Sequence, residues 1–292
     1  MAAPLRITTT LLAVAAAPLL AACGGGNGDA PSIPLADERG SGARIADLVG
    51  EAAWFNADPK AQDSEDCEGV PVDRRVHVTG ATLVAIDRFD ETGEGAHGNH
   101  YVQDSADEPV PYSGMTVFQP AFSPPDLRLF PGDVVDLLGV LTEFRGPSSG
   151  RFRGCRTLPE IGGTMSFRFE DRPAKPIRVP LRALTSYATA RSYLGMLVRV
   201  EGVTTVGDPS RSGGRYTARI NVGAGVPADD IPSLSNELYD LAAEGPPLAD
   251  GAAFGSVTGV LTYFYGFKIA PRCPADFQPE GAPLPADDAC AR

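Results

Sequence analysis

The segment from Phe144 to Arg156 reads FRGPSSGRFRGCR and combines basic with aromatic side chains. It is the most basic stretch of an acidic chain, whose formal net charge is −12. Arginines contact phosphate groups and aromatic rings stack on bases, so this combination is typical of a site for single-stranded nucleic acid. The ligand-binding residues predicted in this segment are Arg145, Arg151, Phe152, Arg153 and Arg156.

Four residues elsewhere extend this predicted site. Tyr101 belongs to a short expected strand, and Tyr263, Tyr265 and Lys268 lie near a matching loop in the second half of the chain. The alternative is structural: the rings pack in the core and the arginines pair with a neighbouring acidic loop. Both interpretations stay open at the level of the sequence.

A second group of reactive side chains lies in the acidic stretch DRFDETGEGAHGNH, Asp87–His100. Its carboxylates and histidines could bind a divalent ion or act as acid and base, but a solvated loop has the same composition. The chain contains no G-x-S-x-G, Walker or H-E-x-x-H motif. We therefore expect no enzyme activity, no cofactor and no metal site, and a metal-dependent hydrolase is the last of three hypotheses.

The elements that would position these residues are repeated along the chain. GVLTEF at Gly139–Phe144 returns as GVLTYF at Gly259–Phe264, and VHVTGATLVA at Val76–Ala85 parallels VRVEGVTTVG at Val198–Gly207. Apolar residues at every second position indicate half-buried strands. The glycine inside each strand predicts a bend or bulge of the kind found at barrel corners.

Two short strands, in GNHYVQDS (98–105) and SGMTVFQP (113–120), separate the long strands of the first copy, and a hairpin loop followed by a fifth strand is expected over 145–161. The sequence therefore predicts an all-β chain with two tandem, OB-like, five-stranded Greek-key barrels. In the second copy, SLSNELYDLAAEG (Ser233–Gly245) predicts a short helix, because its leucines recur at helical spacing.

The first copy resembles the OB-fold-like domains found beside secreted bacterial nucleases and in bacterial surface lipoproteins. The residues that carry the resemblance are Val78–Gly80, Tyr101–Asp104, Ser113–Phe118, Gly132–Val135 and Gly139–Phe144. In those proteins the nuclease chemistry belongs to a separate domain, which this chain lacks. The resemblance implies a binding domain whose ligands contact strands two and three and the one–two and four–five loops.

The first residues read as a leader. A short apolar run ends in Leu20-Ala21-Ala22-Cys23, which resembles the lipobox of bacterial lipoproteins. The resemblance implies cleavage before Cys23, lipidation of Cys23 and anchoring in the membrane, and Gly24 implies the outer membrane. An ordinary secretory leader is the alternative. Whether the protein faces the periplasm or the cell surface stays open.

Four cysteines follow the lipidation site, and an even number in an oxidising compartment predicts disulfides. Four cysteines allow three pairings, of which we favour Cys67–Cys155 and Cys273–Cys290 because each stays within one domain or its tail. A metal site is the alternative, but no C-x-x-C spacing supports it.

The predicted organisation is a leader over 1–22, a lipidated flexible tether over 23–44, a first barrel over 45–169, a linker over 170–180, a second barrel over 181–278 and a tail over 279–292. The first functional hypothesis is a lipid-anchored, non-catalytic binding or scaffold module of the cell envelope, with a protein or glycan partner. The second is a single-stranded nucleic-acid-binding accessory to an extracellular nuclease.

Overall fold

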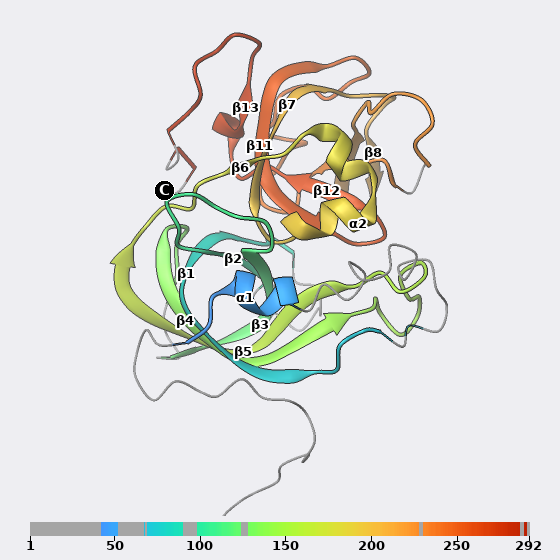
Figure 1. Cartoon of the computed structure of the whole chain (residues 1–292). Helices are drawn as coiled ribbons and strands as arrows, with labels where there is room; N and C mark the ends of the chain where they lie inside the picture. Colours follow the sequence, from blue (N-terminus) through green and yellow to red (C-terminus); the bar gives the residue numbers. More distant parts are fainter. Residues whose placement is uncertain are drawn as a thin grey trace, which may run out of the picture.

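The computed structural model describes residues 42–51, 67, 69–89, 98–123, 128–227, 230–286 and 289–290. The predicted leader, the lipidation site Cys23 and most of the predicted tether lie outside these residues. The described chain consists mainly of β-strands arranged in two sheets, which confirms the all-β prediction. Figure 1 shows the first unit, built from β1 to β5, beside the second unit, built from β6 to β13.

The first unit is a closed barrel with the strand order β1-β2-β3-β5-β4. Strands β3 and β5 are parallel, and the other neighbours are antiparallel. The strands are β1 (Arg74–Ile86), β2 (His100–Asp104), β3 (Gly114–Ser123), β4 (Asp133–Phe144) and β5 (Leu158–Asp171). The stretch 145–161 contains the β4–β5 loop and the start of β5, which begins at Leu158 and extends to Asp171.

The bend predicted inside the first strand is present. Gly80 has a φ of +70°, and the pairing of β1 with β4 shifts between Val78 and Ala81. A residue with a side chain is strained at this φ, whereas glycine is not. The bulge lets one long strand turn the corner of the barrel, so that Val76 and Ala81 are both fully buried.

A short helix, α1 (Ile45–Glu51), closes one side of the first barrel's core. Ile45 and Leu48 are buried in the same apolar cluster as the barrel strands. The Asp104 carboxylate accepts the backbone N–H groups of Ile45 and Ala46 at 2.8 and 3.0 Å. These groups have no partner within the helix, so Asp104 acts as its cap although it comes from β2.

The second unit is a sheet with the order β6-β7-β11-β12-β10-β9-β8, and β13 pairs with β11. It contains eight strands, whereas we predicted five. The strands are β6 (Ile177–Arg178), β7 (Leu197–Thr204), β8 (Ser210–Ser212), β9 (Arg215–Arg219), β10 (Ser233–Ser235), β11 (Ala253–Tyr263), β12 (Phe267–Ala270) and β13 (Phe277–Gln278). Strand β6 lies inside the predicted linker and pairs in parallel with β7.

The two sides of the second sheet meet just beyond β7 and β9. Thr205 and Ile220 form an isolated antiparallel bridge, and the N–H of Val206 donates to the carbonyl of Arg219 at 2.9 Å. Strands β10 and β12 are parallel, as β3 and β5 are in the first unit. The five main strands of the second unit therefore have the same circular order as those of the first.

The helix predicted at Ser233–Gly245 is wrong. The segment begins as strand β10, and a few turns follow. The Asn236 side chain accepts the N–H of Tyr216 at 2.9 Å and donates to the carbonyl of Gly214 at 3.1 Å, so it bonds to the neighbouring strand. Side chains of this kind compete with helix formation. The leucine at 234 is buried because it faces the sheet interior, and the helical spacing is a coincidence.

Short helices occur instead between β6 and β7 and near the C-terminal end. They are η3 (Leu181–Thr185), α2 (Tyr187–Ala190), η4 (Arg191–Tyr193) and η6 (Pro274–Asp276). The structure also contains both favoured disulfides, Cys67–Cys155 and Cys273–Cys290, which confirms this pairing. The first fixes the β4–β5 loop to the segment before β1, and the second fixes the end of the chain.

Candidate binding surface at the junction of the two units

The loop between β4 and β5 leaves the first unit and packs against the second. The N–H of Phe152 donates to the carbonyl of Arg145 at 2.9 Å, which closes the loop. The Phe152 side chain is 3% exposed and belongs to the apolar cluster of the second unit. Its edge-on partners, at centroid distances of 5.0 to 5.8 Å, are Phe144, Tyr263, Phe264 and Tyr265. Contrary to our prediction, Phe152 is an anchor between the units and offers no face to a ligand.

Three other predicted ligand residues are also buried between the units. Tyr101, on β2, is 4% exposed and packs in a cluster with Val260 of β11. Tyr263 lies next to Phe152 and is 2% exposed. Arg156 donates from Nη1 to the Asp230 carboxylate at 2.8 Å, with both side chains largely buried. At these three positions the structural alternative is correct: the two tyrosine rings pack in the apolar interface, and the buried arginine is paired with a carboxylate. A buried charge without such a partner would be costly.

The turn between β11 and β12 brings exposed aromatic rings to the same place. Phe264 and Tyr265 are 44% and 48% exposed. The Tyr265 hydroxyl donates to the carbonyl of Gly150, in the β4–β5 loop of the first unit. Nζ of Lys268 lies 5.7 Å from the centre of the Phe264 ring, within the range of a cation–π contact. The four–five loops of both units therefore form one surface.

We call this region the junction surface; it consists of Arg145, Arg151, Arg153, Phe264, Tyr265 and Lys268. Arg151 and Arg153 are exposed and Arg145 is half-buried. Among the described residues, neither Arg145 nor Arg151 has an ionic partner. Lys268 is paired with the buried Glu237 at 2.9 Å. The surface thus offers unpaired positive charge beside two exposed rings, on a chain that is acidic as a whole.

A buried ionic network beneath this surface was missed by the sequence analysis. Nη2 of Arg191 donates to both oxygens of Glu143 at 2.7 and 2.8 Å, and both side chains are nearly fully buried. The Thr157 hydroxyl donates to Glu143 at 2.7 Å, and the N–H of Thr157 donates to the Tyr187 hydroxyl at 2.7 Å. Burial alone would lower the pKa of the Arg191 guanidinium. The interactions with Tyr187 and Glu143 are stronger than this effect, so the pKa is raised.

One signal in the sequence marks the place of this network. GVLTEF and GVLTYF differ only at Glu143 and Tyr263, which are equivalent positions of the repeat. Both are buried where the units meet, Glu143 against Arg191 and Tyr263 against the rings of Phe152 and Tyr187. A charged residue at a position that holds an aromatic residue in the other copy indicates that the charge has a partner of its own. The sequence does not show which residue that partner is.

The structure also places part of the acidic stretch 87–100. Asp87 is 5% exposed and accepts the N–H of Phe89 at 2.8 Å, and His100 is 2% exposed with Nδ1 at 2.9 Å from the carbonyl of Gly98. The remaining candidates, Asp90, Glu91, Glu94 and His97, lie outside the described residues. Within the described part of the chain, no group of three or more histidine, cysteine, aspartate or glutamate residues could hold a metal ion.

No family model and no curated protein matches the chain. No helix in the described ranges is long and apolar enough to span a membrane. The two disulfides indicate an extracellular or periplasmic location, where such bonds form and persist.

Proposed function

We propose that the chain is a lipid-anchored protein of the cell envelope that binds a partner, a protein or a glycan, without catalysing a reaction. The observation that carries this proposal is the contact of Tyr265 with Gly150, which joins loops of both units into the junction surface. Exposed aromatic rings and arginines are the residue types that dominate binding energy at protein interfaces. Aromatic rings also stack on sugars, so both partner classes fit.

The fold supports the proposal. We infer OB-like barrels from the strand order β1-β2-β3-β5-β4 of the first unit, in which β3 is parallel to β5, and from the same circular order in the second unit. OB-like barrels use the loop between strands four and five for binding. In this chain, the tip of the first unit's loop is occupied by the contact with the second unit. Binding is therefore expected from the combined surface and not from either loop alone.

The proposed location rests on the sequence and on the disulfides. The resemblance of Leu20–Cys23 to a lipobox supports a lipid anchor, and Gly24 after the cysteine supports the outer membrane. The disulfides are consistent with a chain that has crossed into an oxidising compartment.

Retention of a partner tests the main proposal. The full chain with Cys23→Ser, which removes the lipid, is immobilised and exposed to envelope protein and glycan fractions at physiological salt. We expect a partner to be retained by this protein and lost from an Arg151→Gln, Phe264→Ala variant. The matched control is Arg172→Gln, Phe130→Ala, whose residues are exposed near the opposite end of the β4–β5 hairpin. Equal retention by both variants contradicts the proposal.

A second candidate function is binding of single-stranded nucleic acid. The specific observation in its favour is the combination of two exposed rings with Arg145, Arg151 and Arg153, because bases stack on rings while arginines contact phosphates. Anisotropy of a labelled single-stranded oligonucleotide tests it. We expect binding that weakens steeply with salt and weakens again in Arg151→Gln, Arg153→Gln. No binding at low salt removes this candidate and leaves the first one untouched.

A further inference from the structure

The second unit contains a hollow that lies apart from the junction surface. Its volume is about 380 Å³, and its lining residues are Glu244, Gly245, Pro246, Ala253, Phe254, Pro274, Phe277 and Pro279. They come from the segment after β10, from the start of β11 and from the C-terminal strand β13 with its flanking residues. Small-molecule sites in proteins begin at about 300 Å³, so a compact ligand fits this volume.

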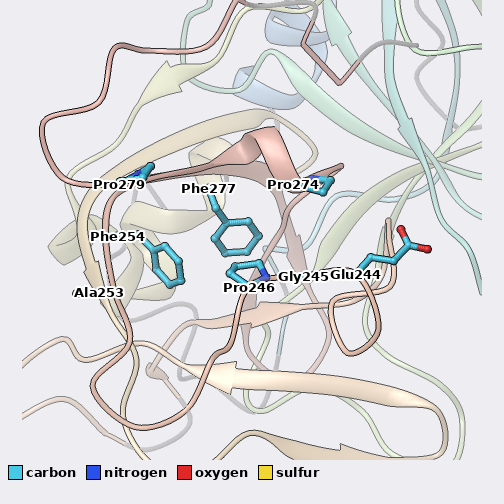
Figure 2. Close-up of a pocket in the computed structure, with 8 residues that line it drawn as sticks. All are labelled: Glu244, Gly245, Pro246, Ala253, Phe254, Pro274, Phe277 and Pro279. Atoms are coloured by element: carbon cyan, nitrogen blue, oxygen red, sulfur yellow. The ribbon is translucent and has the colours of Figure 1, made fainter.

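The floor of the hollow is aromatic and apolar. The rings of Phe254 and Phe277 lie 5.0 Å apart with an interplanar angle of 56°. Figure 2 shows these two rings and Pro246 gathered in the middle, with Pro274 and Pro279 above them. Proline has no N–H to donate, so a peptide strand would gain few backbone hydrogen bonds here. This lining favours a flat, apolar ring over a polar chain.

Glu244 is the one charged residue of the lining. Its side chain is exposed, it stands at one side of the hollow in Figure 2, and no described residue forms an ion pair with it. By contrast, the neighbouring Asp276 is buried and neutralised by Arg272 at 2.9 Å. Glu244 therefore places a negative charge at the rim of the hollow, with its carboxylate directed away from the two rings in Figure 2, and this charge repels anions and attracts cations.

We propose that this hollow binds a small organic cation that carries an aromatic ring. The ring packs on Phe254, Phe277 and Pro246, where edge-to-face contacts are favourable. The ammonium group lies toward Glu244 and is also attracted by the electron-rich faces of the two phenylalanines. This site is independent of the partner bound at the junction surface, and its failure would leave the proposed function unaffected.

The test uses 4-phenylbutylamine and its anionic counterpart 4-phenylbutyrate, with the full chain carrying Cys23→Ser, by ligand-observed NMR titration. We expect the amine to bind with a dissociation constant on the order of 1 mM, as befits a small ligand. 4-Phenylbutyrate should bind at least about threefold more weakly than the amine. The expected difference is modest because Glu244 is a single exposed carboxylate. Equal binding of the two probes, or none of the amine, overturns the proposal.

Two variants locate the site. Glu244→Gln should remove the preference for the amine, whereas the control Glu108→Gln, an exposed glutamate of the first unit, should keep it. Ala253→Phe fills the hollow from an exposed position, so it should abolish amine binding while circular dichroism shows an intact fold. Amine binding that Glu244→Gln and Ala253→Phe leave unchanged contradicts the assignment.

Discussion

The guanidinium of Arg191 donates two hydrogen bonds to the carboxylate of Glu143, at 2.7 and 2.8 Å, with 0% and 3% of the two side chains exposed. Glu143 lies near the end of β4 in the first unit, and Arg191 lies in the helical segment that leads into β7 of the second. A buried pair with this geometry is specific, because each charge requires the other. It fixes the place of the β4–β5 loop, and with it the junction surface.

Removing one member of this pair should be strongly destabilising. Glu143→Ala leaves the Arg191 guanidinium buried without its counter-charge, and we expect a loss of about 3–5 kcal/mol in the free energy of unfolding. Urea denaturation followed by circular dichroism measures it. The double variant Glu143→Leu, Arg191→Leu leaves no unpaired charge and should lose less. A loss below about 1 kcal/mol in Glu143→Ala would show that the pair does not hold the units together.

The anchor in the β4–β5 loop gives a second prediction. Phe152→Ala removes a buried ring that four others surround, so we expect a loss of about 3–5 kcal/mol in the free energy of unfolding. Phe169→Ala is the matched control, because this ring is 84% exposed and the same change should have little effect. Similar losses in both variants would contradict the packing described for Phe152.

Glu160 predicts a dependence of stability on pH. Burial raises the pKa of this carboxyl from 4.5 to about 7, and Asp73 and Glu143 add to the effect through their negative charge. The folded state therefore binds the proton more tightly than the unfolded state. The contribution to stability is most favourable below about pH 4.5 and is lost as the pH rises through about 7.

The Glu160→Gln variant isolates this contribution. Since Gln carries no charge, we expect it to be more stable than the parent protein by about 2 kcal/mol at pH 8, and the difference should shrink toward pH 5. Denaturant unfolding at several pH values measures this difference. A constant difference between the two proteins from pH 5 to pH 8 would show that Glu160 has an ordinary pKa.

Much of the fold could be predicted from local patterns. Alternation of apolar residues locates β1, β4 and β11, and the glycine at 80 identifies the bend, because these features depend on neighbours along the strand. The disulfides follow from the order of the cysteines. The helix expected at Ser233–Gly245 failed because the leucine spacing suits a helix, while the Asn236 bonds to β9 are not visible in the sequence.

The candidate site was predicted only in part, for a different reason. The basic and aromatic residues of the two loops do gather, but no local pattern distinguishes a ring that anchors an interface, such as Phe152, from one that faces solvent, such as Tyr265. That distinction depends on how the second unit lies against the first. The Glu143–Arg191 pair joins residues 48 positions apart and likewise requires the tertiary structure.

Photo-crosslinking in the producing cells shows whether the junction surface contacts a partner. A photoreactive phenylalanine derivative is placed at Arg151 in the native, lipid-anchored chain, and at Arg172 as the control near the opposite end of β5. We expect a discrete cross-linked species at position 151 and none at position 172. Absence of any adduct at position 151, or the same adducts at both positions, would contradict the proposed contact.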